Sequence, residues 1–256
     1  MKSAVDLNSD LGEGAGFDDE LLSLVTSANI ATGFHAGDSN TIRATIGAAR
    51  SRGVAIGVHP SLFDRENFGR KELPITTEQL YDIINYQLGI FQAIAQSVGA
   101  VVNHVKPHGA LYNMAARDRS VAVPIVRAIH DIDRELLLYA PGESALAAAG
   151  RAHGMRVVAE VFADRGYQSD GSLVPRDGPG AVLADPEAAA TRVMRMLSEG
   201  KVRSVNGGDI VISAETICVH GDTPDAVKFV QSLRQQLEKH GVEIRAPIKS
   251  GSSRRD

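Results

Sequence analysis

Cysteine is almost absent from this sequence of 256 residues, in which the only one is Cys218. An intrachain disulfide is therefore excluded, which fits a reducing compartment. The sequence also has no apolar run of the ~18 residues that a membrane span requires, and charge in its first six residues comes too early for a signal peptide. We therefore expect a cytoplasmic protein that has no contact with a membrane.

An excess of positive charge is absent as well. Lysine and arginine number 27 against 31 acidic residues, the formal net charge is -4, and no basic stripe is visible along the sequence. This balance argues against nucleic acid as a partner, because a binding protein of that kind gathers positive charge on one face.

Several motifs that carry known chemistry are also missing. The sequence has no GxxxxGK[ST] phosphate loop, no GxSxG nucleophile elbow, and no HExxH or CxxC metal motif. The stretch GEGAG at 12–16 is not a dinucleotide loop, because its third glycine is misplaced and an acid stands where pyrophosphate would bind. The chain thus shows no recognisable ATP site, and Cys218, inside an apolar strand, is expected to be an inert thiol.

What the sequence does contain is a regular alternation of strand and helix patterns. With 43% hydrophobic and 23% charged residues it can bury a substantial core, and its length suits one α/β barrel of about 250 residues. The predicted strands cover 4–7, 28–32, 54–58, a run that begins at 100 and is stopped by Pro107, 136–139, 156–162, 216–219 and 243–245. The predicted helices cover 18–25, 41–52, 77–98, a segment from 110, 121–131, 144–153, 185–199 and 223–240.

This alternation repeats seven times without a linker or a change in composition. It predicts an α/β fold with a seven-stranded, distorted (β/α) barrel over residues 1–249, followed by a polar, disordered tail at 250–256. A doubly wound open sheet is the alternative, because strand patterns alone do not count the strands of a barrel. Two irregular inserts, at 62–73 and 168–183, interrupt the pattern, and the first is long enough to act as a lid or a partner surface.

The stretch NHVKPHGALYN at 103–113 is the segment most indicative of chemistry. Side chains of a strand alternate between two faces, so His104, Lys106 and His108 point to the same side. Pro107 stops strand pairing, and the glycine after His108 lets the chain turn into a helix. We therefore expect Lys106 and His108 to face a wet barrel mouth, where α/β folds keep their catalytic groups.

Polar groups of the same kind follow the other predicted strands. Four strands end in a histidine, and acidic residues stand beside several of them. Any one such histidine is more often structural, but four at equivalent positions around a barrel mouth indicate a site. The candidate site residues are Asp10, Glu13, His35, Asp38, His59, Lys106, His108, Glu160, Asp164, His220 and Asp222.

Imidazoles and carboxylates around one cleft support two kinds of chemistry. They can bind a divalent metal that activates water, for which Asp10, His59 and His108 are the candidate ligands. They can also act as general acids and bases without a metal. The sequence leaves both alternatives open, because it has no tight metal spacing.

Six segments of the sequence together resemble the LamB/YcsF family: VDLNSDLGE, ANIATGFHAGD, GVHPSLFD, VKPHGALYN, EVFADRGY and ICVHGD. They follow in family order from Val5 to Asp222, within a match that extends to about His240. The resemblance implies a barrel of the glycoside hydrolase/deacetylase type. Because members of the family are A subunits of bacterial 5-oxoprolinase, it also implies ATP-dependent opening of the 5-oxoproline (pyroglutamate) lactam to L-glutamate together with the B and C subunits. Such a partnership agrees with the missing phosphate loop.

Two positions depart from the family pattern. Thr32 stands where the family usually has a cysteine, so either a thiol is dispensable there or this member differs in activity. Ser39 and Asn40 replace the more usual proline after Asp38. We interpret this second departure as a variation at the start of a helix, with Asn40 as its N-cap.

The chemistry of lactam opening suggests roles for the candidate residues. His59 or His108 would be the base that activates water, and Lys106 would be the cation that faces the carboxylate or phosphate of the substrate. The acidic residues would orient the histidines or hold a metal. Two other functions would use the same site: a metal-dependent deacetylase of acetylated sugars, and a non-catalytic subunit that binds 5-oxoproline for a partner.

Overall fold

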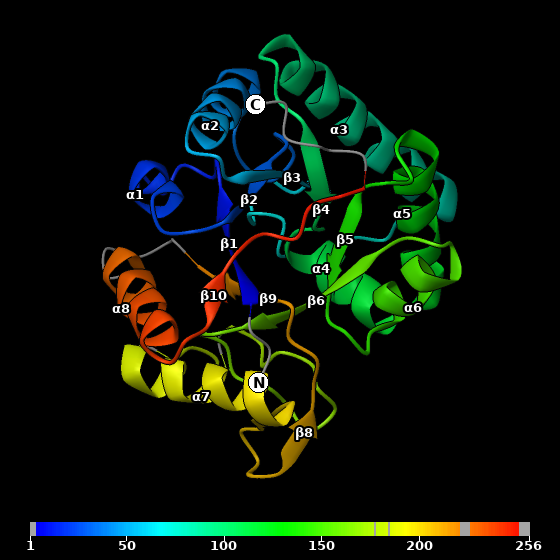
Figure 1. The fold of residues 1–256 in the computed structure, drawn as a ribbon. Helices are drawn as coiled ribbons and strands as arrows, with labels where there is room; N and C mark the ends of the chain where they lie inside the picture. Colours follow the sequence, from blue (N-terminus) through cyan, green and yellow to red (C-terminus); the bar gives the residue numbers. More distant parts are fainter. Residues whose placement is uncertain (1–3, 177, 184, 221–225, 251–256) are drawn as a thin grey trace.

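Seven parallel strands close into a barrel at the centre of the computed structural model, which describes residues 4–176, 178–183, 185–220 and 226–250. Neighbouring strands follow in chain order, and the last of them pairs with both the sixth and the first, which closes the ring (Figure 1). The predicted seven-stranded barrel is thereby confirmed, and the open sheet is excluded. The barrel strands are β1 (Ala4–Leu11), β2 (Ser27–Ala31), β3 (Ala55–His59), β4 (Val102–Val105), β5 (Leu137–Ala140), β6 (Val157–Phe162) and β9 (Thr216–Val219).

The described residues form eight helices, which surround the barrel on its outside (Figure 1). Their apolar faces pack on outward-facing strand residues in one continuous core, where Ile46, Phe91 and Ile129 are fully buried. The helices are α1 (Asp18–Leu22), α2 (Ser39–Ser51), α3 (Thr77–Ser97), α4 (Gly109–Arg117), α5 (Arg119–Ile132), α6 (Ala145–Ala152), α7 (Pro186–Glu199) and α8 (Ala226–Lys239).

The barrel interior carries polar side chains at its N-terminal end, where barrels of this kind usually pack aliphatic ones. The carboxylate of Asp6 accepts hydrogen bonds of 2.6–2.9 Å from the hydroxyl groups of Thr26, Ser27, Tyr139 and Thr216. Burial raises the pKa of Asp6, although these hydroxyl donors oppose the effect. This network occupies the N-terminal end of the barrel interior. Polar groups further along the same strands lie at the opposite, C-terminal end.

The first strand is longer than the sequence predicted. β1 continues to Leu11, beyond the predicted end at residue 7. Asn8 and Asp10 do not end the strand, because their side chains find hydrogen-bond partners inside the barrel, including the Asn29 amide. Polar residues that look like a loop in the sequence are therefore part of the barrel wall.

The first two helices also differ from the prediction. Helix α1 begins at Asp18 as predicted but ends at Leu22, and its Asp18 carboxylate accepts a hydrogen bond from the Gly12 N–H. Asp38, and not Asn40, caps α2 by accepting a bond from a backbone N–H three residues ahead. Helices α6 and α7 have Ser144 and Asp185 as their N-caps, each at the first residue of its predicted range.

Two small strand elements complete the described fold. An antiparallel hairpin that the sequence did not predict, β7 (Lys201–Arg203) and β8 (Asp209–Val211), follows α7. The predicted terminal strand is present as β10 (Glu243–Ile244) and pairs with the start of β1. The predicted tail at 250–256 lies, apart from its first residue, outside the described residues, and one domain over 1–249 stays a prediction. None of the described helices has the length and apolar character needed to cross a lipid bilayer.

Candidate active site

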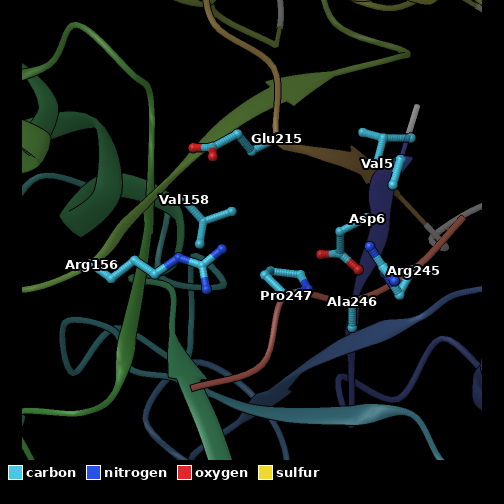
Figure 2. Close-up of a pocket in the computed structure, with 9 residues that line it drawn as sticks. Val5, Asp6, Arg156, Val158, Glu215, Arg245, Ala246 and Pro247 are labelled. Atoms are coloured by element: carbon cyan, nitrogen blue, oxygen red, sulfur yellow. The ribbon is translucent and has the colours of Figure 1, made fainter. Parts of the chain in front are cut away.

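A cavity of about 890 Å³ opens at the C-terminal ends of the barrel strands. A smaller cavity of about 190 Å³ lies at the opposite end of the barrel, where Figure 2 shows Asp6, Arg156 and Glu215 around it. The acids of the smaller cavity are already engaged, Asp6 by the hydroxyl network and Glu215 by the N–H of Ala159. The larger cavity is therefore the candidate active site.

Lys106 lies at the centre of a buried charge cluster between β1, β4 and β6. Its ammonium nitrogen is 3.0 Å from Asp10 Oδ1 and 2.9 Å from Glu160 Oε1. It also lies 3.3 Å from Asn8 Oδ1 and 3.1 Å from Cys218 Sγ. Burial lowers the pKa of Lys106, but the charges of Asp10 and its neighbours outweigh burial and raise the pKa well above its ordinary value.

Lys106 lines the cavity at the barrel mouth, as expected, but it is buried there and not solvated. Its side chain is 3% exposed, because carboxylates from two other strands close over it. An ammonium group has three N–H bonds, and the four surrounding acceptors engage them. Burial raises the pKa of Asp10 too, but its contact with His59 and the charge of Lys106 hold it well below its ordinary value, so Asp10 is ionised. Lys106 thus neutralises one buried acid, Glu160, and one partly buried acid, Asp10.

Three histidines and Glu13 form a second cluster beside Asp10. Glu13 Oε1 lies 2.9 Å from His35 Nε2 and 3.4 Å from His108 Nδ1. His59 Nε2 lies 2.9 Å from His108 Nδ1 and 3.3 Å from Asp10 Oδ2. Strand ends that are far apart in the sequence therefore bring these five predicted site residues together.

Backbone carbonyl groups set the orientation of two of the imidazoles. His59 Nδ1 lies 2.7 Å from the Lys106 carbonyl oxygen, and His108 Nε2 lies 2.9 Å from the Phe68 carbonyl oxygen. A carbonyl oxygen only accepts hydrogen bonds, so these two ring nitrogens carry hydrogen. In the neutral rings the other nitrogens, His59 Nε2 and His108 Nδ1, are lone-pair atoms that face each other and Glu13.

The first insert, at 62–73, forms a wall of this cluster. Phe68 has a φ of 56°, a strained value for a residue with a side chain, and its carbonyl oxygen accepts the His108 hydrogen bond. A Cβ on Gly69 would lie 2.8 Å from His108 Cδ2 and 2.9 Å from His35 Cβ, so this position needs glycine. The insert therefore holds the histidines from outside the barrel.

Burial determines the charge of the cluster. It lowers the pKa of His35 to about 3 and that of His108 well below its ordinary value, and the neighbouring His59 strengthens both effects. Burial together with the charge of Asp10 raises the pKa of Glu13. A neutral His108 keeps a lone pair that can accept a proton, which is what a general base requires.

The other predicted site residues lie in different places. His220 lines the cavity next to Asp164, with 2.7 Å between Nδ1 and Oδ2. Asp38 is exposed at the start of α2, so the structure does not bring it to the site. Asp222 lies outside the described residues.

His104 shares the face of Lys106, as the alternation predicted, but it does not reach the mouth. Its ring is fully buried in the barrel interior, where it stacks on Tyr139 and Nε2 lies 2.8 Å from Asn29 Oδ1. Burial lowers the pKa of His104 to about 3. His104 therefore belongs to the layer beneath the site.

Two residues of the site were not among the predicted ones. The Tyr112 hydroxyl donates to Glu160 Oε2 at 2.6 Å, and the Asn8 amide donates to Glu160 Oε1 at 3.1 Å. Both had a signal in the sequence. Tyr112 follows His108 by one helical turn, and Asn8 alternates with Asp10 along one strand.

Two groups of described side chains have ligand atoms within 4.8 Å of one another, close enough to hold one metal ion. The predicted ligands Asp10, His59 and His108 are divided between them. The first group is Glu13, His35, His59 and His108, and the second is Asp10, Cys218 and His220.

The sequence profile of the LamB/YcsF family matches residues 5–252. The chain belongs to the LamB/YcsF family. It is 49% identical over 247 residues to the 5-oxoprolinase A subunit of Geobacillus kaustophilus (strain HTA426), covering 95% of this chain and 96% of that one. It is 47% identical over 251 residues to the 5-oxoprolinase A subunit of Bordetella pertussis (strain Tohama I), covering 96% and 100%.

Solved structures show the same family and the same fold. The lactam utilization protein from Thermus thermophilus matches with a TM-score of 0.89 at 42% identity, covering 96% of this chain and 100% of that one. A T48 deacetylase with substrate matches with a TM-score of 0.50 at 16% identity, covering 94% and 86%. The second likeness concerns the fold alone.

The structure places both departures from the usual LamB/YcsF pattern. The Thr32 hydroxyl donates to the Gln87 side chain at 2.6 Å, and Gln87 in turn binds the backbone of Ser61 after β3. Position 32 thus supports the chain behind the site. Ser39 and Asn40 are the first residues of α2, so the second departure lies at a helix start, as interpreted.

Thr32→Cys should leave the activity of the assembled enzyme nearly unchanged. A thiol is a weaker donor than a hydroxyl group, and the change affects only the contacts of Thr32 with the Gln87 side chain and the His59 carbonyl oxygen. Steady-state turnover is the measurement, and Thr32→Val, which cannot donate, is the matched control. A gain of a hundredfold or more, about 2.7 kcal/mol of barrier, would show instead that the thiol takes part in the reaction.

Proposed function

We propose that this chain is the A-type component of an ATP-dependent 5-oxoprolinase and takes part in opening the 5-oxoproline lactam to L-glutamate. The names of relatives that match nearly the whole chain, 5-oxoprolinase A subunits and a lactam utilization protein, support the proposal. The observation that carries it is a neutral His108 beside buried, neutralised acids at a cavity that accommodates a small ring.

The proposed reaction activates a stable amide before water attacks it. The γ-phosphoryl group of ATP moves to the amide oxygen of the lactam, and ADP leaves. Water then attacks the activated carbon, and the ring C–N bond breaks as the ring nitrogen takes up a proton, which leaves an acyl phosphate. A second water hydrolyses the acyl phosphate and releases inorganic phosphate. The products are L-glutamate, ADP and inorganic phosphate.

The base in this scheme is His108, or His59 in contact with it. Both histidines line the cavity, and each ring donates one N–H to a carbonyl oxygen, which holds the ring in position. Asp10 and Glu13 stabilise positive charge on these rings as the proton arrives. Lys106 acts as a positioning residue, in contrast to the substrate-binding cation expected from the sequence.

Because Lys106 is engaged by two acids, a different cation must bind the carboxylate of 5-oxoproline. We assign this role to Arg165. It lines the same cavity and is buried, with bonds to the carbonyl oxygens of Ala181 and Val174. A guanidinium group has five N–H donors, so these two bonds leave others for a carboxylate. Five residues stay candidate site residues without an assigned step: His35, Glu160, Asp164, His220 and Asp222.

We propose that the B and C subunits supply the ATP chemistry, because this chain contains no phosphate loop. The relatives' designation as subunits supports the need for partners. The assembly would act in the cytoplasm, where ATP is held.

The isolated chain should therefore not hydrolyse ATP. Incubated with ATP and 5-oxoproline, it should release no phosphate above background, whereas the mixture with the B and C subunits should release phosphate and glutamate in equal amounts. Enzymatic phosphate and glutamate assays measure both products. Robust 5-oxoproline-dependent ATP hydrolysis by this chain alone would contradict the division of labour.

The same preparations separate the two alternative functions. Acetate release from acetylated sugars without ATP would favour a deacetylase and overturn the proposal. Tight 5-oxoproline binding with full activity of the complex after replacement of both His59 and His108 would favour a non-catalytic binding role.

A further inference from the structure

We propose that Glu13, His59 and His108 bind one divalent transition-metal ion, with Oε1, Nε2 and Nδ1 as ligand atoms and zinc as the ion that fits best. The proposal deepens the proposed function at the same site, because a bound ion would occupy the lone pairs assigned there to the base and would itself activate water in their place. It is tested separately, because metal binding requires neither the substrate nor the partner subunits.

The first observation is that acceptor atoms face one another at the centre of the cluster. His59 and His108 each donate one ring N–H to a backbone carbonyl oxygen, so their other nitrogens present lone pairs that are only 2.9 Å apart. Glu13 Oε1 and Asp10 Oδ2 converge on the same point. Such a gathering of lone pairs is stabilised by a cation, and an N–H bond to a carbonyl oxygen is what commonly orients a metal-binding histidine.

The second observation is the spacing of the three proposed ligand atoms. The two nitrogens are 2.9 Å apart, and Glu13 Oε1 lies 3.4 Å from His108 Nδ1 and 3.9 Å from His59 Nε2. Zinc bonds of about 2.0–2.1 Å separate the ligands of a tetrahedral ion by roughly 3.3 Å. The three measured distances bracket that value, so the site requires only small side-chain adjustments.

Ring orientation decides which histidines are ligands. The planes of His59 and His108 are nearly perpendicular, at 85°, so their lone pairs can meet at one point. His35 instead stacks on His108 with its plane tilted by only 4° and the ring centroids 3.8 Å apart. Because an ion lies in the plane of the ring that binds it, parallel stacked rings do not share one. His35 is therefore a positioning residue that contacts Glu13 at 2.9 Å.

The fourth coordination position is open to Asp10 or to a small ligand. Asp10 Oδ2 lies 3.3 Å from His59 Nε2, while its other oxygen is held by Lys106. The rival group that contains Cys218 is disfavoured, because the Lys106 ammonium lies 3.1 Å from the sulfur and repels a second cation. Two imidazoles, one carboxylate and an open position form a ligand set of catalytic zinc.

The test is titration of the chelator-treated, full-length chain with Zn²⁺ alone, and with Co²⁺ as a spectroscopic probe. We expect one equivalent to bind and Co²⁺ to give visible absorption bands. Glu13→Ala, His59→Ala and His108→Ala should each lower affinity by more than 100-fold, because each removes a ligand. His35→Ala should lower it by about 10–100-fold, as for a residue that orients a ligand. Glu13 is only partly buried, so its variant is the one least coupled to folding.

Three controls make the result decisive. Cys218→Ser and His220→Ala should bind as wild type does, and so should His153→Ala, a histidine at the end of α6 whose Nδ1 faces the Ala149 carbonyl oxygen. Circular dichroism of every variant establishes that it is folded. Absence of stoichiometric binding by the folded wild type would overturn the proposal and indicate a proton shared between His59 and His108. Unchanged affinity in folded Glu13→Ala, or loss of binding in Cys218→Ser, would also overturn it.

Discussion

Lys106→Met should lower the free energy of unfolding by about 3–5 kcal/mol, the usual cost of removing one partner from a buried ion pair. The substitution keeps the length of the side chain but leaves the buried Glu160 carboxylate and the partly buried Asp10 carboxylate without their common cation. Since these groups line the cavity, turnover of the assembled enzyme should be lost as well. Urea denaturation followed by circular dichroism measures the stability.

The double variant Lys106→Met with Glu160→Gln provides the internal control. It removes one of the two uncompensated charges while keeping a polar partner for Tyr112, so part of the lost stability should return. Lys239→Met, at an exposed position in the last turn of α8, should cost less than about 1 kcal/mol. A Lys106→Met variant as stable as wild type would show that the buried charges are compensated in another way.

His108→Ala should lower turnover of the assembled enzyme by about 10²–10⁴-fold, the range for loss of an acid–base group. The ring is 6% exposed, and its lone-pair nitrogen borders both Glu13 and His59. Because the residue is buried, its loss is expected to affect the fold as well, unlike that of a group facing a wet mouth. Turnover must therefore be normalised to the folded fraction, which thermal melting provides.

His153→Ala is the matched control, a partly buried histidine at the end of a helix that leads into the N-terminal side of β6. It should keep wild-type turnover. The metal content of His108→Ala separates two causes of a loss, since a ligand role removes the metal while a base role leaves it bound. Wild-type rates in both His108→Ala and Lys106→Met would place the active site elsewhere.

Local patterns predicted the elements and the sides on which residues lie. The alternation of His104, Lys106 and His108 placed all three on the interior face of the barrel, because the period of a strand depends on the backbone alone. The burial of each side chain was not predictable in the same way. Lys106 is buried because Asp10 and Glu160, 96 and 54 positions away along the chain, close over it in the folded barrel.

The candidate site was predictable as a set but not in its internal arrangement. His59 is the last residue of a strand, and Asp38 lies in the loop after another strand. In the structure Asp38 caps a helix at the surface, whereas His59 contacts His108 in the site. The spacing of residues in the sequence does not distinguish the two roles. Each role depends on which backbone N–H or imidazole ring lies next to the side chain in the folded protein. The β7–β8 hairpin escaped prediction because three-residue strands carry too little periodicity.

By itself, the sequence determined a seven-strand α/β alternation, the absence of a phosphate loop and the set of strand ends that carry imidazole and carboxylate groups. Those features depend on residue type and on short-range backbone geometry. Only the tertiary structure decided that Lys106 neutralises two acids, and that Glu13, His59 and His108 point their lone pairs at one spot. The physical reason is that charge, burial and lone-pair direction are set by neighbours that closure of the barrel brings together from strands far apart in the chain.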